Sequence, residues 1–419
     1  MSLKKNLISY SVVNIINASV PFFILPILTF YLSPEDFGKL SIIQLLFTIT
    51  LPFLLVNIYG LFKIEYSKLS FEEFKIFVSS IILIPIFVFF IIQILFFIFS
   101  DRLSEMFDIP EKWIMLSPIV VLFQCIPTMI PVLFQAKKQP FNYGLFKISL
   151  TILNMGLSLL FIILLVQGFE GRLYGIFYSY LIMTFFGIFF LFKLKLIGLN
   201  ISFTYIKDAL KFGIFLIPHS ISGVVLSVSD KFFISNILGN EAVGIYSVAF
   251  QIASAVAIIM TSINQAWVPH LYEKLNAKPD NKVKRQIVIQ TYKIMGFMFF
   301  VSLCFVLMIS FIYQIFIDER YHSGINFAKL LVVGFMFQGF YFMVTNYIFY
   351  LKKSNLLSII TMSATIFNLI LNYYLILLFG IYGVIYAMIL CWFLFFIMTW
   401  ILSNKIYYMP WFKGLMYDK

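Results

Sequence analysis

Long apolar stretches recur along the whole chain, and each is long enough to cross a membrane. The hydrocarbon core of a bilayer is about 30 Å thick, so a crossing helix needs about 20 mainly apolar residues. The sequence predicts an all-α integral membrane protein with twelve such spans. We place them at roughly 7–32, 41–62, 76–99, 114–135, 146–166, 173–192, 211–238, 243–268, 293–316, 325–350, 356–379 and 381–403.

The composition agrees with lipid as the solvent. Apolar residues make up 62% of the chain and charged residues 11%, whereas charged residues approach a quarter of a soluble domain. The many aromatic residues, 53 Phe and 24 Tyr among them, suit lipid-facing helices and interfacial belts. Cys125, Cys304 and Cys391 all lie in apolar runs without a paired spacing, so we interpret them as packing residues rather than metal ligands.

Basic residues are distributed unequally between alternate loops. Of the 30 Lys and Arg residues, 23 fall in the N-terminal tail, every second loop and the C-terminal tail. By the positive-inside rule, this asymmetry predicts that both termini of an inner-membrane protein are cytoplasmic. The net charge of +12 therefore reflects topology and does not imply nucleic acid. The seven basic residues on the other side are Lys39, Arg102, Lys112, Arg172, Lys231, Arg320 and Lys329.

Two halves of the chain resemble each other. Residues 32–41 share Leu, Glu, Gly and Ser with residues 238–247 at an offset of 206, and Thr151 to Asn154 match Thr365 to Asn368 at an offset of 214. A third pair, 174–178 and 382–386, matches at an offset of 208. Internal repeats of this kind build many transporters. We therefore predict two six-helix bundles, residues 1–206 and 207–419.

The number of spans in each half fixes the kind of repeat. Because each half has an even number of spans, both halves enter the membrane from the same side, so the repeat is parallel. Its pseudo-twofold axis then lies along the membrane normal, and a central cavity is expected between the bundles. The spans leave little mass outside the bilayer, since no external loop exceeds about fourteen residues.

The sequence carries no enzyme motif that we recognise. It lacks HExxH, GxSxG and the phosphate-binding GxxxxGK[ST] pattern, and it contains three histidines. The short external loops also leave no room for the large catalytic loop expected of a membrane polysaccharide polymerase. We therefore predict neither catalytic residues nor a metal site, and ATP is excluded as the direct energy source.

Polar residues within spans are the best candidates for function, because an ionisable group at membrane depth is costly and usually faces protein or water. The seventh span contains Pro218, His219, Asp230 and Lys231. Asp230 and Lys231 are either a pair that anchors the helix end or lumen-facing substrate contacts. His219 either makes a helix–helix hydrogen bond or contributes to binding or proton coupling.

Polar side chains are concentrated in the first, second, seventh and eighth spans. Asn14, Gln44 and Gln265 are among them, and such side chains suit either a hydrated cavity or contacts between helices. Lys63 and Arg172 border membrane ends, where we interpret them as interface anchors.

The seventh span and the turn after it contain three recognisable motifs. They are Lys211-Phe212-Gly213 with Pro218, the pair Asp230-Lys231, and the turn Gly239-Asn240-Glu241-Ala242-Val243-Gly244-Ile245-Tyr246. With these motifs the chain resembles polysaccharide flippases, and more narrowly O-antigen (Wzx-type) transporters. The resemblance extends over nearly the whole chain through the twelve spans and the Asn-containing fifth and eleventh spans.

This resemblance implies a fold like that of the multidrug/oligosaccharidyl-lipid/polysaccharide exporters (MATE/MOP-like), with two bundles forming a V around a cavity. It also implies a flippase that moves an undecaprenyl-pyrophosphate-linked oligosaccharide, an O-antigen or capsule repeat unit, to the outer leaflet by alternating access. A polymerase and a chain-length regulator are the protein partners it implies, beside membrane lipids. Coupling to H⁺ or Na⁺ is open, and no other cofactor is expected.

The same resemblance suggests roles for individual residues. Lys231 would be the cation that meets the pyrophosphate, and Asp230 would position it. His219, Asn14, Gln44 and Gln265 would contact sugars or line the path.

Two other functions fit part of the pattern. A cation-coupled multidrug antiporter shares the fold, but a site for cationic drugs would need more carboxylates within the membrane than Asp230. A major-facilitator transporter shares twelve spans and a parallel repeat, but residues 63–75 lack the Gly-x-x-x-Asp-Arg-x-Gly signature.

Overall fold

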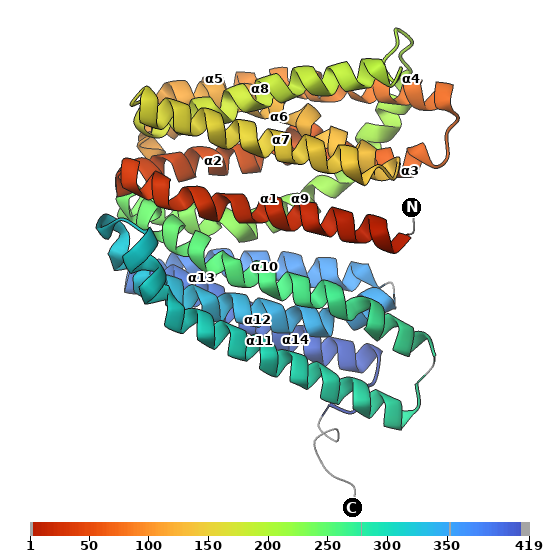
Figure 1. Ribbon diagram of the computed structural model, residues 1–419, viewed down its shortest axis with the longest axis vertical. Coiled ribbons are helices and arrows are strands. Elements are labelled where there is room, and N and C mark those ends of the chain that lie inside the picture. The colour runs from red at the N-terminus through yellow and green to blue at the C-terminus, as the bar shows by residue number, and fades with distance from the viewer. Residues whose placement is uncertain (1–2, 278, 352, 412–419) are drawn as a thin grey trace, which may run out of the picture. The chain divides into compact units, whose positions relative to one another are not determined.

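The computed structural model describes the backbone of residues 3–277, 279–351 and 353–411. Within these ranges, the side chains of residues 3–12, 15, 218, 219, 227 and 354–361 lie outside the description. The described backbone is a series of long helices joined by short connections (Figure 1). These are α1 (Leu3–Tyr31), α2 (Pro34–Leu55), α3 (Leu61–Tyr66), α4 (Phe71–Ile81), α5 (Leu83–Phe107), α6 (Glu111–Ala136), α7 (Pro140–Leu159), α8 (Gly168–Lys193), α9 (Phe203–Leu238), α10 (Asn240–Asn276), α11 (Asn281–Phe316), α12 (Ile325–Tyr350), α13 (Ser354–Phe379) and α14 (Ile381–Ile406), with 3₁₀ turns at Ile58–Gly60 and Glu319–Gly324 and a π turn at Leu160–Leu164.

Eleven helical segments of the described chain are long and apolar enough to cross a membrane. They correspond to the second to twelfth predicted spans, and the prediction of an all-helical membrane protein is confirmed. The first helix, α1, has 29 residues, of which Ile16–Tyr31 form the described apolar part. Along α5 and α11, few side chains are buried and many of the exposed ones are apolar, as expected of helices that face lipid.

The ends of the helices follow local sequence signals. Ser33 caps α2 by accepting a hydrogen bond from the Asp36 N–H at 3.1 Å, and Pro34 occupies the first turn, where its missing N–H costs nothing. Val56, with φ 46°, ends α2 in the left-handed conformation. The helix therefore begins and ends about seven residues before the predicted span 41–62. Two hairpins are as tight as predicted, with three residues between the π turn and α8 and Gly380 alone between α13 and α14.

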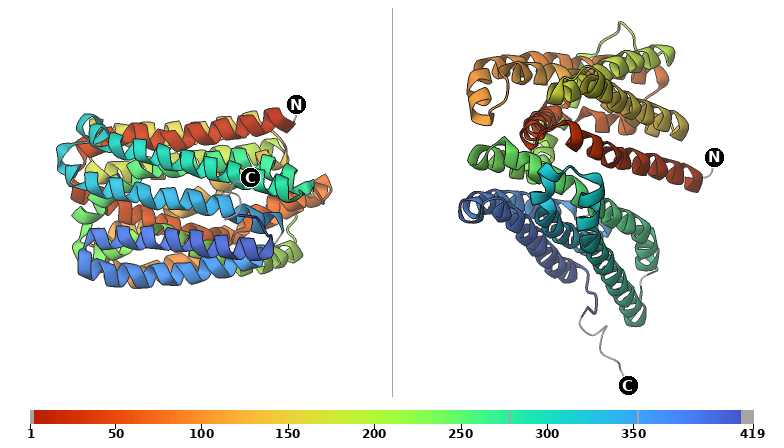
Figure 2. Two further views of the ribbon diagram at one scale, coloured as in Figure 1. Left: turned by 90° about the horizontal axis from the view of Figure 1, so that it is seen from below. Right: turned by 60° about the vertical axis from the view of Figure 1, so that its left-hand side comes forward.

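The chain forms two compact units, Met1–Gly244 and Ile245–Lys419. In the first unit, α7 packs against α8 and α1, α6 packs against α2, α5 and α8, and α9 packs against α2 (Figure 1). In the second unit, α14 packs against α12 and α13, and α11 packs against α12 (Figure 2). The helix α9 and the first turn of α10 thus pack with the first unit, although the repeat assigns them to the second half of the sequence.

The repeat found in the sequence reappears as a reciprocal contact between two helix starts. A Cβ added to Gly38 of α2 would collide with the carbonyl of Asn240, and one added to Gly244 of α10 would collide with the carbonyl of Pro34. Each residue of the first contact lies 206 positions from its counterpart in the second, which is the offset of the matched turns. The first turns of α2 and α10 therefore cross with their main chains in contact.

Candidate functional site

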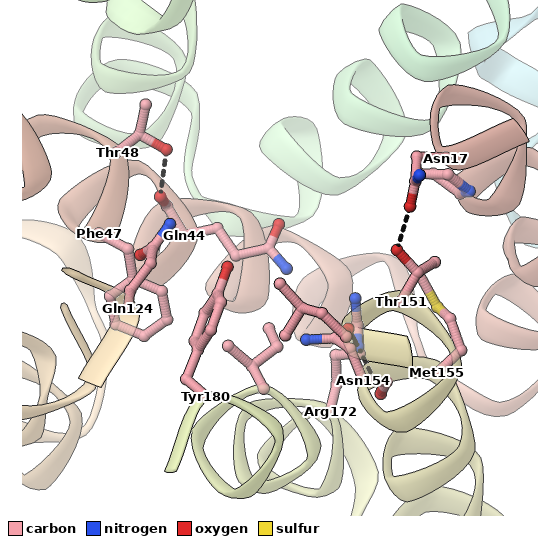
Figure 3. Close-up of a pocket in the computed structure, with 13 residues that line it drawn as sticks. Asn17, Gln44, Phe47, Thr48, Gln124, Thr151, Asn154, Met155, Arg172 and Tyr180 are labelled. Carbon is pink, nitrogen blue, oxygen red and sulfur yellow. Dashed lines mark hydrogen bonds between the residues drawn. The ribbon is translucent and has the colours of Figure 1, made fainter. Parts of the chain in front are cut away.

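A polar cavity of about 330 Å³ opens within the first unit. Its walls come from α1, α2, α6, α7 and α8, so helices far apart in the sequence share it (Figure 3). A cavity of this size is within the range of small-molecule sites. The residues that line it are Asn17, Pro21, Gln44, Phe47, Thr48, Gln124, Leu150, Thr151, Asn154, Met155, Arg172, Ile176 and Tyr180.

Close packing of α8 against α7 places Arg172 in this cavity. A Cβ on Gly175 would collide with Ser158, and a Cβ on Gly171 would lie 2.9 Å from the carbonyl carbon of Phe161. The two glycines are four residues apart and flank Arg172, a spacing that lets helices in membranes approach closely. The side chain of Arg172 is 8% exposed.

The guanidinium of Arg172 is held from one side. Its Nη1 donates to the side-chain oxygen of Asn154 at 2.6 Å, to the Asn154 carbonyl at 3.3 Å and to the hydroxyl of Ser158. Asn154 is itself oriented, because its amide donates to the Ser179 hydroxyl at 3.0 Å. All these partners are neutral, and no ion pair of Arg172 occurs in the part of the chain that the structure describes. The charge of Arg172 is therefore not neutralised by its described neighbours.

The other edge of the guanidinium faces the cavity. No hydrogen bond from Nε or Nη2 is present within the described chain, and neither atom is enclosed. Figure 3 shows the side chains of Gln44, Tyr180 and Arg172 extending into the same space. Because Nε and Nη2 form the fork that binds carboxylate or phosphate with two parallel hydrogen bonds, Arg172 is arranged to receive an anion.

Uncharged donors and acceptors surround this cation. The hydroxyl of Thr151 donates to the side-chain oxygen of Asn17 at 2.5 Å, and the amide of Asn17 donates to the Val13 carbonyl at 2.8 Å. The side-chain oxygen of Gln124 is enclosed and has no hydrogen-bond partner within the described residues, so it can accept a hydrogen bond from a bound ligand. The lining contains amides, hydroxyls and one cation but no carboxylate. Such a set can bind a negatively charged group together with hydroxyl-rich neighbours.

A second cation lies one turn from the cavity along α7. Lys147 donates to the side-chain oxygen of Asn14 at 3.1 Å and to the hydroxyl of Tyr143 at 3.2 Å. The Tyr143 hydroxyl also donates to Asn14 at 2.6 Å. This cluster joins α1 to α7 just as Asn17 and Thr151 do one turn further along.

Of the residues predicted from the sequence, Gln44 lines the cavity. Asn14 lies beside it in the Lys147 cluster, with its own side chain exposed. On α9, Asp230 is 4% exposed and Lys231 is half-buried, and neither lines the cavity. Gln265 is exposed on α10 in the second unit, and the side chain of His219 lies outside the described residues.

Arg172 corrects one of the interpretations drawn from the sequence. As an interface anchor it would be largely exposed at a membrane end, but it is buried in the second turn of α8 and lines the cavity. The error follows from the boundary of the predicted span, which begins at residue 173, whereas α8 begins at Gly168. The sequence did carry a signal for the correct placement, since Gly171 and Gly175 form a close-packing motif around Arg172.

Comparison with known proteins identifies the family. The family model for polysaccharide biosynthesis protein matches residues 3–275, and the MatE model matches residues 216–374. A protein of the lsg locus of Haemophilus influenzae is 24% identical over 87% of this chain and 89% of its own length. A Shigella flexneri protein assigned as an O-antigen transporter is 26% identical over 45% of each chain.

Solved structures show the same fold. An inward-facing multidrug-resistance MATE transporter superposes with a TM-score of 0.69, at 16% identity, over 93% of this chain and 94% of its own. The MATE multidrug transporter DinF-BH gives a TM-score of 0.63, at 16% identity, over 96% of each chain. The chain therefore has the fold of the MATE transporters, and it belongs to the polysaccharide biosynthesis protein family.

Proposed function

We propose that this transporter moves an undecaprenyl-pyrophosphate-linked oligosaccharide, an O-antigen or capsule repeat unit, from the cytoplasmic to the outer leaflet of the bacterial inner membrane. The observation that carries the proposal is the placement of Arg172, a buried cation with a free hydrogen-bonding edge in a cavity of amides and hydroxyls. A pyrophosphate joined to sugars presents anionic oxygens next to hydroxyl groups. The cavity offers a partner for each.

The physical problem of transport explains why such a cavity is needed. A charged, hydroxyl-rich headgroup cannot enter hydrocarbon without losing its hydration, whereas its apolar polyprenyl tail dissolves in the hydrocarbon core. A cavity that replaces the hydration shell with fixed donors lowers this cost. In the proposed cycle of alternating access, Arg172 binds two phosphate oxygens through Nε and Nη2, and Gln44, Gln124 and Thr151 bind sugar hydroxyls.

Other residues complete the proposed path. Lys231, positioned by Asp230, provides a further cation, which lies on α9. His219, Asn14 and Gln265 contact sugars or line the route. We expect Lys231→Gln and His219→Gln each to reduce transport, whereas transport at the wild-type rate in either variant would remove that residue from the path. We further propose that α1 also crosses the membrane, which brings the number of spans to twelve. Both termini are then cytoplasmic, and a gradient of H⁺ or Na⁺ supplies the energy.

The polymerase and the chain-length regulator remain proposed partners. The rival reading of a multidrug antiporter for cations gains no support from this cavity, because its lining contains no Asp or Glu and one Arg.

Complementation of a deletion strain tests the proposal. We expect the wild-type gene to restore surface polymer, and Arg172→Ala to leave lipid-linked oligosaccharide accumulated on the cytoplasmic face. Two lost charge-assisted hydrogen bonds, each worth about 1.5–3 kcal/mol, predict at least a tenfold fall in transport.

The matched control is Arg102→Ala, which removes the same charge from an exposed position on α5 and should transport normally. Protein levels in the membrane must be equal in the three strains. Full surface polymer with Arg172→Ala at a normal protein level would refute the role of Arg172. Full surface polymer in the deletion strain would refute the proposed function itself.

A further inference from the structure

A second, apolar cavity lies between α7 and α8, away from the polar one. Its volume is about 480 Å³. It opens on the outside of the unit, since Ile152 is 65% exposed and Leu145 and Phe186 are more than half exposed. Eight of the residues that line it are apolar, and the full set is Asn142, Leu145, Phe146, Ser149, Ile152, Leu153, Ile182, Met183, Phe186 and Phe190. We call it the α7–α8 groove.

The groove exists because α7 and α8 separate toward one end. Near the hairpin that joins them, Gly171 and Gly175 bring the two main chains together. Away from the hairpin the two helices diverge (Figure 1), and the rings of Phe146 and Phe190 lie 6.4 Å from each other between their centres. The widened part of the interface leaves room for a chain to lie between the helices.

Basic residues surround the wide end of the groove. The ring of Phe134, near the end of α6, contacts both Phe146 and Phe190, with centroid distances of 6.4 and 5.9 Å. These contacts gather the end of α6, the start of α7 and the end of α8. Lys147 follows Phe146 and is bound to Asn14 and Tyr143. Four other lysines lie within five residues of these rings, at the end of α8 and in the connections after α6 and α8, namely Lys137, Lys138, Lys193 and Lys195.

The charge at this end is not balanced by acidic residues nearby in the chain. Glu170 is the one acidic residue between positions 112 and 207, and it pairs with Lys112 at 2.6 Å at the opposite end of α8. Within the described chain, none of the four lysines forms an ion pair. The wide end of the groove thus presents positive charge beside an apolar channel.

We propose that the α7–α8 groove binds an anionic phospholipid of the surrounding bilayer, with an acyl chain between the helices and the phosphate among Lys137, Lys138, Lys193 and Lys195. Charge and length both favour this occupant. From Asn142 to Leu153, α7 rises roughly 17 Å, which is close to the roughly 15 Å of half a bilayer core. Asn142, at the wide end, supplies an amide at headgroup level.

Lipid binding tests this proposal without any oligosaccharide, so its outcome is independent of the proposed function. The full-length protein is reconstituted in nanodiscs of phosphatidylcholine with one tenth phosphatidylglycerol, extracted, and analysed by native mass spectrometry for retained lipid. We expect phosphatidylglycerol to be enriched at least threefold over its share of the bilayer.

Two kinds of variant separate the contributions of charge and groove. Changing the four lysines together to Gln should abolish the enrichment, whereas the same change at Lys63, Lys207, Lys211 and Lys282, which are exposed elsewhere, should preserve it. Filling the groove with Ser149→Phe should release the lipid although every lysine remains. Ile152→Trp, at a more exposed position, repeats the test if Ser149→Phe does not fold.

Several results would overturn the proposal. Equal retention of phosphatidylcholine would show that charge does not select the occupant. Enrichment that survives both groove-filling variants would reduce the effect to surface electrostatics. Displacement of phosphatidylglycerol by a neutral polyprenol would assign the groove to an isoprenoid chain instead.

Discussion

Replacing Gly175 with alanine tests whether close packing of α7 and α8 positions Arg172. The added methyl would lie 2.5 Å from the Ser158 nitrogen and 2.6 Å from its Cα, whereas carbon atoms in contact are normally about 3.5–4.0 Å apart. Because the obstacle is main chain, α8 must retreat by about 1 Å. The 2.6 Å hydrogen bond from Arg172 to Asn154 would then stretch to about 3.6 Å, which is beyond hydrogen-bonding range.

The magnitude follows from two opposing effects. Alanine is favoured over glycine within a helix by roughly 0.5–1 kcal/mol. Overpacking a close interface costs typically about 1–3 kcal/mol, and losing the hydrogen bond to a buried guanidinium adds about 1.5–3 kcal/mol. We therefore expect a net destabilisation of roughly 2–5 kcal/mol, together with reduced transport.

Gly156 provides a matched control on the facing helix. A Cβ at Gly156 would meet nothing within 4 Å, so Gly156→Ala gains the helix preference without a collision. Thermal unfolding of both purified variants, with surface-polymer complementation in the same strains, measures stability and transport. If Gly175→Ala and Gly156→Ala unfold at the same temperature and transport equally, the packing argument is wrong.

Three further predictions follow from other contacts. Arg172→Lys keeps the charge but loses the planar fork, so we expect transport between the wild-type level and that of Arg172→Ala, and equal transport by Arg172→Lys and wild type would contradict a bidentate contact. Asn240→Ala removes the amide that donates to the carbonyls of Phe107 and Asp108 at 2.8 and 3.0 Å. It should lower the free energy of unfolding by about 1–3 kcal/mol. Chemical denaturation of the purified variant measures this, and an unchanged midpoint would refute it. Gly38→Ala and Gly244→Ala should each destabilise the protein, because each methyl meets a main-chain carbonyl, whereas Gly296→Ala, with open space at its Cβ, should not; the three unfolding temperatures decide the matter.

Hydropathy predicted the helices better than it predicted their ends. The apolar runs located eleven helices of the described chain that are long and apolar enough to span a membrane, because burial in lipid demands a length and composition that few other structures need. The ends were less certain, because they depend on caps that hydropathy does not register. At α2, Ser33 and Pro34 start the helix well before the apolar window begins.

The cavity was only partly visible in the sequence. Gln44 was identified because an amide within a span stands out against apolar neighbours. Arg172 was missed, since a cation near a span boundary is usually an anchor, and the motif of Gly171 and Gly175 that packs α8 on α7 was not weighed against that expectation. Lys147 was missed for the same reason, and the pairing of Asn17 with Thr151 joins residues 134 positions apart, a separation that no local pattern encodes.

The crossing of α2 and α10 has a consequence for how the two repeats evolve. Because Gly38 and Gly244 each meet a main-chain carbonyl, the contact depends on the path of the backbone and on two absent side chains. It imposes no requirement on the identity of most neighbouring residues. After duplication of an ancestral gene, this main-chain contact is kept as long as the two glycines are kept, so a shared architecture persists although the two turns have few residues in common.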